Sequence, residues 1–258
     1  MRRVCILAVV VSLPLAAVAC SGSEKPTYLA LGDSYAAGVG ASDEDEGYVP
    51  LFFSFLGEAR GEHLSLRNLA ISGETTSSMI ATGQFGMALA ELRFRNQDQN
   101  TKNDVFVVTI DIGYNDILRF AGSGQPCAPP TPAGAPTCAA AVDDALDATT
   151  KNLTSILRSL RIAAGPSVKI LILDYFNSYS GTGRPLEDVA DFILPLLNRR
   201  IAEVAALPGI EADVVHTFAA FDGKGGQLTN INGPEGDFHP NDDGYRVLAD
   251  LLIDAYKR

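Results

Sequence analysis

The chain has little positive charge. Of its 258 residues, 20 are Lys or Arg and 31 are Asp or Glu, so the formal net charge is −11. A surface this acidic repels a phosphate backbone, and we therefore expect no nucleic acid partner. Hydrophobic residues make up 47% and charged residues 20% of the chain, which are the proportions of a globular protein rather than a disordered one.

Long hydrophobic runs are absent after the first twenty residues, so no later segment is expected to span a bilayer. The one early run, 4–18, follows Arg2 and Arg3 and is too short for a stable span, which predicts a signal peptide over 1–19. Small residues before Cys20 resemble a bacterial lipobox, in which Cys20 is lipidated and 20–26 form a tether. Plain secretion, with cleavage after the same small residues, is the alternative. Either way we expect an exported protein, anchored on the outer side of the cell membrane or released.

Cysteine is scarce, with four in the chain. Cys5 leaves with the signal peptide and Cys20 becomes the first mature residue, so Cys127 and Cys138 remain as an even pair in an oxidising compartment. They bracket a Pro-rich stretch, and we predict a disulfide between them; two free thiols are the alternative. Two Cys without nearby His are too few to hold a metal, and we expect no metal.

Apolar runs typical of strands alternate with helical patterns along the rest of the chain. The expected strands are 27–31, 64–70, 104–110, 168–173 and 213–217, and the expected helices are 47–60, 75–94 (broken near Gly83 and Gly86), 139–164, 185–206 (kinked at Pro195) and one that begins near Asn241. This alternation predicts an α/β protein: one three-layer α/β/α domain over 27–258, with a central parallel sheet and a Pro-rich insertion at 122–138. Such sheets place their sites at the carboxyl ends of the strands.

Three short polar motifs follow apolar strands at that expected edge. They are Gly-Asp-Ser at 32–34, Ser-Gly at 72–73 and Gly-Tyr-Asn-Asp at 113–116, and a fourth, Asp-Phe-His-Pro at 237–240, precedes the last helix. A Ser hydroxyl needs a base to become a nucleophile, and the chain has three His. His63 lies in an exposed-looking context and His216 in an apolar strand, whereas His239 lies in a polar loop. The alternatives are structural: a turn at 32–34 and a helix cap at 113–116.

The order and spacing of these four blocks resemble those of the GDSL, or SGNH, hydrolases. The resemblance implies a flavodoxin-like fold and a serine esterase with Ser34 as nucleophile and His239 as base. It also implies an oxyanion hole formed by the amides of Ser34 and Gly73 and the side chain of Asn115. We expect hydrolysis of a small or polymeric carboxylic ester by a monomer, without a cofactor.

The sequence departs from the family pattern at the acid that orients the histidine. In the family an Asp usually lies three residues before the His, but Gly236 occupies that place here. We predict that Asp237 orients His239; Glu235, or a backbone carbonyl in a Ser-His dyad, is the alternative. For the substrate we favour a lipase or general esterase, with a carbohydrate or peptidoglycan O-acetylesterase as the alternative. A non-catalytic glycan-binding lipoprotein is the hypothesis from another class.

Overall fold

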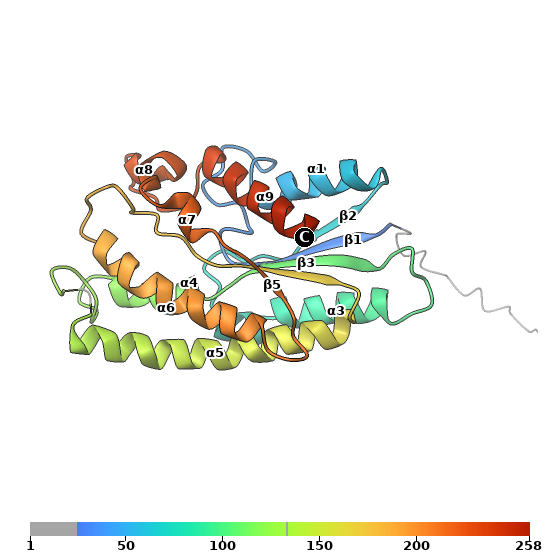
Figure 1. Cartoon of the computed structure of the whole chain (residues 1–258), viewed down its shortest axis with the longest axis horizontal. Coiled ribbons are helices and arrows are strands. Elements are labelled where there is room, and N and C mark those ends of the chain that lie inside the picture. Colours follow the sequence, from blue (N-terminus) through green and yellow to red (C-terminus); the bar gives the residue numbers. More distant parts are fainter. Residues whose placement is uncertain (1–24, 133) are drawn as a thin grey trace, which may run out of the picture.

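The computed structural model describes residues 25–132 and 134–258, which form a parallel sheet between two layers of helices (Figure 1). The strands are β1 (Thr27–Gly32), β2 (Ser65–Asn68), β3 (Val105–Asp111), β4 (Lys169–Leu173) and β5 (Asp213–Val215), in the order β2-β1-β3-β4-β5. All four pairings are parallel. The predicted three-layer α/β/α architecture is confirmed.

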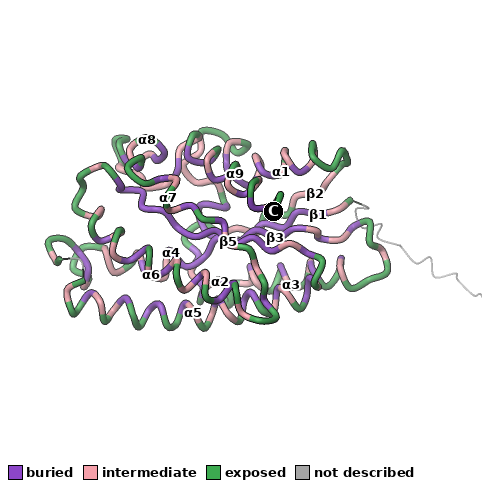
Figure 2. Tube along the Cα trace, in the orientation of Figure 1, coloured by how far each residue is buried: buried purple, intermediate pink, exposed green. Residues whose placement is uncertain are grey.

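The central strands are buried on both faces, which explains their nearly continuous apolar sequences. Every residue of β1 is buried, as are all but one of β3 and β4. Figure 2 shows this buried sheet at the centre, with exposed segments on the outer sides of the helices. The core therefore holds the central strands, and with them the loops that follow their carboxyl ends.

Each face of the sheet is covered by its own set of helices (Figure 1). One face carries α1 (Tyr48–Arg60) and α9 (Asp242–Lys257), and the other carries α2 (Thr76–Thr82), α3 (Gln84–Asn96), α5 (Pro136–Ala164) and α6 (Glu187–Ala205). Asn241 caps α9 as expected, because its side chain accepts the Gly244 backbone N–H.

The helix predictions need three corrections. The 75–94 segment breaks at Gly83 alone, where the backbone is left-handed, and Gly86 lies inside α3. Helix α5 begins at Pro136 rather than 139, because proline is well suited to the first turn of a helix. Short helices that follow strands or loops were not predicted: α4 (Tyr114–Leu118), η1 (Arg119–Ala121), α7 (Phe218–Phe221), α8 (Gly225–Leu228) and η2 (Asn230–Asn232).

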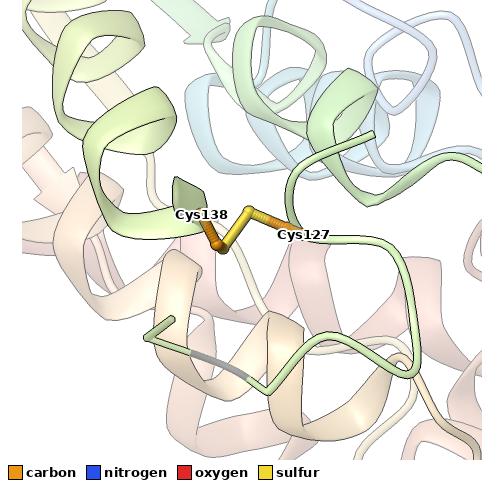
Figure 3. The surroundings of a disulfide bond; sticks show 2 residues. All are labelled: Cys127 and Cys138. Atoms are coloured by element: carbon orange, nitrogen blue, oxygen red, sulfur yellow. A yellow bond between two sulfur atoms is a disulfide. The ribbon is translucent and has the colours of Figure 1, made fainter. Parts of the chain in front are cut away.

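Cys127 and Cys138 form a disulfide, as predicted, which joins the Pro-rich insertion to the first turn of α5 (Figure 3). The predicted signal peptide and Cys20 lie outside the described residues. Within the described part of the chain, no helix combines the length and the hydropathy that crossing a membrane requires.

Candidate active site

Ser34 lies just beyond the carboxyl end of β1, in a tight turn that the surrounding residues fix. The Asp33 carboxylate accepts the Tyr35 backbone N–H at 3.1 Å, and the Asp33 carbonyl accepts the Ala37 N–H at the same distance. Gly32 is required here, because its φ is +147° and a Cβ would lie 1.9 Å from a carboxylate oxygen of Asp111. The hydroxyl of Ser34 points to His239 and caps no helix, so the turn serves to present the side chain.

A chain of hydrogen bonds runs from Ser34 through His239 to Asp237. Ser34 Oγ lies 2.9 Å from His239 Nε2, although 205 residues separate them in the sequence. His239 Nδ1 lies 2.5 Å from Asp237 Oδ1. Phe238 stacks on the imidazole with ring centroids 4.4 Å apart, and the edge of Tyr35 packs at 6.0 Å. Both ring nitrogens therefore have partners, and the rings beside the imidazole restrict its orientation.

The unusual spacing of Asp237 is explained by a local turn. Its Oδ1 accepts both the ring Nδ1–H and the backbone N–H of His239, the latter at 3.1 Å, which is the side-chain-to-backbone pattern of an Asx turn. Gly236 has a left-handed backbone with φ of +63°, a conformation that disfavours an Asp there. Glu235 is exposed and makes no hydrogen bond with His239. Asp237 is therefore the acid in contact with the imidazole.

The loop of Gly73 is joined by a hydrogen bond to the start of α4, which carries Asn115. The Asn115 side-chain amide donates to the Glu74 carbonyl at 2.9 Å and, over 3.4 Å, to the Asp33 carboxylate. Asn115 lies in the first turn of α4 but its side chain does not cap that helix. Gly73 is exposed with φ of +80°, and no atom lies within 4 Å of where its Cβ would be. The backbone at Gly73 is thus open to an approaching molecule.

Asp116 is the last residue of the Gly-Tyr-Asn-Asp block and was given no role of its own, yet it supports both of these segments. Its carboxylate accepts the Thr76 backbone N–H at 2.9 Å and the Thr76 hydroxyl at 2.6 Å, at the start of α2. Helix α2 begins three residues after Gly73, and Asn115 directly precedes Asp116. The carboxylate therefore fixes the segment from Gly73 to the start of α2 against the first turn of α4, and it stabilises the unpaired N–H groups at the start of α2.

A pair of buried carboxyl groups, Asp33 and Asp111, lies next to Ser34. The Asp33 backbone N–H donates to Asp111 at 2.7 Å, the Tyr175 hydroxyl donates to Asp33 at 2.9 Å, and the Tyr48 hydroxyl donates to Asp111 at 2.8 Å. Burial raises the pKa of Asp33 to about 7. Burial, and then the neighbouring charge of Asp33, raise the pKa of Asp111 well above its usual range. Asp111 could have been identified from the sequence by its position, because it is a single acid at the end of the apolar strand β3.

Gln84 and Glu74 hold the second loop against β1. Gln84 is fully buried; its side chain accepts the Gly32 N–H at 2.8 Å and donates to the Gly32 carbonyl at 3.1 Å and to Glu74 at 3.0 Å. The end of β1 and the loop of Gly73 are thereby fixed to one another. No sequence motif marked Gln84, because it lies at the start of a helix rather than in a block.

The other two histidines lie elsewhere. His63 is exposed and precedes β2. His216 was predicted to lie in a strand, but β5 ends at Val215, one residue before it; its Nδ1 has a partner, Asp174, at 2.9 Å, and its side chain is 70% exposed. Among the described residues, no group of three or more His, Cys, Asp or Glu side chains is arranged as metal ligands.

Known proteins resemble the chain over most of its length. The model of the GDSL-like lipase/acylhydrolase family matches residues 30–247. The spore germination lipase LipC of Bacillus licheniformis is 24% identical in an alignment of 238 residues that covers 87% of this chain and 93% of LipC.

Among solved structures, the lipase Lip_vut3 from a goat rumen metagenome superimposes with a TM-score of 0.68 at 23% identity, over 90% of this chain and 97% of that one. The acetylxylan esterase Axe2 of Geobacillus stearothermophilus does so with a TM-score of 0.55 at 20% identity, over 89% and 93%. These two likenesses establish a shared fold. Because the family model covers most of the chain, the protein belongs to the GDSL-like lipase/acylhydrolase family and is an ester hydrolase.

Proposed function

We propose that the protein is a serine esterase that hydrolyses carboxylic esters, with Ser34 as nucleophile, His239 as general base and Asp237 as the acid that orients it. The observation that carries the proposal is the unbroken hydrogen-bond chain from Ser34 Oγ through both imidazole nitrogens to Asp237. A Ser hydroxyl at 2.9 Å from a histidine nitrogen is within the range for proton transfer. The acid holds the ring in the tautomer that leaves Nε2 free to accept.

The proposed reaction proceeds in two stages. Ser34 Oγ attacks the ester carbonyl carbon while its proton passes to His239 Nε2, and collapse of the tetrahedral intermediate expels the alcohol with that proton. Water then attacks the acyl-serine, again giving a proton to His239, which returns it to Ser34 Oγ as the carboxylic acid leaves. Asp237 stays ionised throughout and stabilises the imidazolium in each stage.

Three donors are proposed to bind the oxyanion: the backbone N–H groups of Ser34 and Gly73 and the side-chain amide of Asn115. The Asn115 amide is held by the Glu74 carbonyl at 2.9 Å, while its contact with Asp33 is long at 3.4 Å. The Asn115 amide hydrogen that faces Asp33 can therefore bind an oxyanion instead, because the weak hydrogen bond to Asp33 is all that is lost. A neutral donor of this kind stabilises developing charge without binding an anion in the resting enzyme.

The substrate is proposed to be a lipid ester or another ester of an apolar carboxylic acid. The ring of Phe238, which stacks on His239, and the ring of Tyr114, which packs against Phe238, support this choice, as does the lipase name of the relative LipC. The alternative, a carbohydrate or peptidoglycan O-acetylesterase, is supported by the fold shared with the acetylxylan esterase Axe2. Acetylated xylan and acetylated peptidoglycan, assayed beside lipid esters, separate the two.

The enzyme is proposed to act outside the cell membrane, attached through Cys20. Two features support this: the residues before Cys20, and the Cys127–Cys138 disulfide, since disulfides persist in oxidising compartments. Mass spectrometry of the membrane fraction is expected to find a diacylglyceryl group on Cys20, and Cys20→Ser is expected to release the protein. A soluble wild type with an unmodified N-terminus would mean plain secretion.

The activity is tested with purified protein and p-nitrophenyl butyrate. Ser34→Ala is expected to lose turnover, whereas the matched change Ser54→Ala, at an exposed position on α1, is expected to keep it. Hydrolysis by Ser34→Ala at the wild-type rate would overturn the mechanism. No hydrolysis of any ester by the wild type would favour a non-catalytic, glycan-binding lipoprotein.

A further inference from the structure

A groove open to solvent lies between the Pro-rich insertion and the loop that precedes α6. The insertion contributes Ser123, Gly124 and Pro129 to its walls, and the loop contributes Tyr179 and Arg184. The empty space, including the part open to solvent, is about 780 Å³. Among the described residues, Arg184 is the one charged residue that lines this groove. In a chain with 31 acidic and 20 basic residues, a groove lined by a cation and no acid is suited to an anion.

The Arg184 guanidinium has hydrogen-bond donors to spare. Its Nη2 donates to the Ile231 carbonyl at 2.7 Å, which holds the side chain in place. Within the described part of the chain, Nε and Nη1 have no hydrogen-bond partner and no carboxylate forms an ion pair with the group. The planar fork of a guanidinium fits a carboxylate or a phosphate through two parallel N–H bonds. Arg184 is therefore anchored on one side and free to bind an anion on the other.

The same guanidinium adjoins the segment that leads to the catalytic histidine. Ile231, which accepts its hydrogen bond, lies eight residues before His239. Gly236 lies closer still to the histidine, and a Cβ on Gly236 would be 3.4 Å from Arg184 Nη1. The cation is thus positioned by the loop that also positions the base.

Tyr179 connects the groove with the site. Its ring lines the groove, and the residue is 9% exposed. Burial raises the pKa of the Tyr179 hydroxyl, the charge of Arg184 lowers it, and the charge of Asp237 raises it. Both charges therefore act on this hydroxyl, which places the groove beside the acid and histidine end of the hydrogen-bond chain.

We propose that Arg184 binds an anionic oxygen group, a carboxylate or a phosphate, on the alcohol half of the substrate, and so selects esters of negatively charged alcohols. This inference rests on the proposed serine esterase mechanism. In that mechanism His239 gives its proton to the alcohol oxygen as the ester bond breaks, so the alcohol lies on the histidine's side of the carbonyl. Arg184 adjoins that side. An apolar acid esterified to a charged alcohol satisfies this preference and the proposed acyl preference together.

The expected effect is on substrate binding rather than on the chemical step. A hydrogen bond to a charged group corresponds to roughly 10- to 150-fold in affinity. Arg184 is exposed, so water competes for its donors, and we expect the low end, about tenfold. Because the anionic group is remote from the reacting atoms, it binds equally in the ground state and the transition state, and its loss should raise KM while kcat stays unchanged.

The test uses pairs of butyrate esters that differ only in the charge of the alcohol. The carboxylate pair is the butyrate ester of ω-hydroxyhexanoate and that of ω-hydroxyhexanamide, and the phosphate pair is butyrylglycerol phosphate and butyrylglycerol. Wild-type protein is expected to prefer the charged member about tenfold in kcat/KM in at least one pair. Arg184→Gln should abolish the preference by raising KM for the charged member alone, and Arg184→Lys, which keeps the charge without the fork, should retain part of it.

The matched control is Arg158→Gln, which removes the same charge from an exposed position on α5 that does not line the groove. It is expected to leave both pairs unchanged. Equal losses for charged and neutral members in Arg184→Gln would make the residue structural and overturn the proposal. So would a shifted pH profile of kcat for the neutral members, because Arg184 would then act on Asp237.

A third pair carries the charge on the acyl half instead: the p-nitrophenyl half-ester of suberic acid and its terminal amide. The proposal predicts that Arg184→Gln leaves the ratio of this pair unchanged. The alcohol assignment is overturned if this ratio changes in place of the first two, or if wild-type protein prefers the neutral alcohols.

Binding is also measured without turnover, in Ser34→Ala protein by calorimetry with the two charged butyrate esters and their neutral partners. At least one charged ester is expected to bind about tenfold more tightly than its partner, and Arg184→Gln in the same background should remove the difference. Equal binding beside normal wild-type turnover would refute the anion site alone. An Arg184-dependent difference in binding, with no turnover by the wild type, would refute the esterase mechanism and leave the anion site.

Discussion

The change Asp237→Asn tests whether Asp237 orients His239, a question that the sequence left open. The substitution keeps the size of the side chain, and an Asn oxygen can still accept the backbone N–H of His239 at this turn. What is lost is the negative charge 2.5 Å from the imidazole, which stabilises the imidazolium formed during attack. Folding should therefore survive, while the chemical step slows.

The expected loss in kcat follows from the strength of the hydrogen bond between Asp237 and His239 and from the exposure of Asp237 to water. A hydrogen bond to a charged group contributes about 1.5–3 kcal/mol, which corresponds to roughly 10- to 150-fold in rate. In serine proteases, where the acid is buried, the equivalent change lowers kcat by about 10⁴-fold. The Asp237 side chain is 33% exposed, so water replaces part of the lost interaction, and we expect a loss of about 10²-fold in kcat.

The assay is steady-state turnover of p-nitrophenyl butyrate, with the melting temperature as a check on folding. Glu235→Gln is the matched control, because it removes the neighbouring charge from an exposed side chain that does not contact His239. Near-wild-type kcat for Asp237→Asn would refute the reasoning and leave a Ser-His dyad. A large loss in Glu235→Gln would transfer the orienting role to that residue.

Three further changes test the supporting structure. Asn115→Ala should lower kcat roughly 10²–10³-fold, through loss of one oxyanion donor, with little change in melting temperature; an equal loss of stability would instead make the residue structural. Asp33→Asn should flatten the pH dependence of stability. Because burial raises the pKa of Asp33 to about 7, from about 3.9 when unfolded, wild-type protein loses stability as pH rises from about 4 through 7. Urea unfolding at pH 5 and pH 8 should show a smaller loss in the variant, and equal losses would contradict the assignment. Finally, Cys127→Ser with Cys138→Ser should lower the free energy of unfolding by at most about 3 kcal/mol, because the bridged residues are 11 apart; unchanged urea denaturation would show that the bridge does not stabilise the fold.

The fold was predictable because its central strands leave a direct trace in the sequence. β1, β3 and β4 are buried on both faces, so each is a nearly continuous apolar run, and the polar blocks at 32–34 and 113–116 follow β1 and β3. The short helices were missed because three to five residues are too few for a helical pattern to repeat. His216 was misplaced because β5 ends one residue before it, and boundaries of that kind depend on pairing with β4.

The site was only partly predictable. The contact between Ser34 and His239 follows from the four blocks and the small number of histidines. The contact of Asp237 depends on a turn in which one oxygen accepts two N–H groups, and spacing alone does not specify that geometry.

The central claim, that Ser34 is the nucleophile, is tested most directly by a fluorophosphonate probe followed by peptide mapping. The probe phosphonylates a serine only where a base activates its hydroxyl. We predict a single modified peptide carrying the adduct on Ser34, with labelling abolished in Ser34→Ala and in His239→Ala. Modification of a different serine, or none in active wild-type enzyme, would contradict the account.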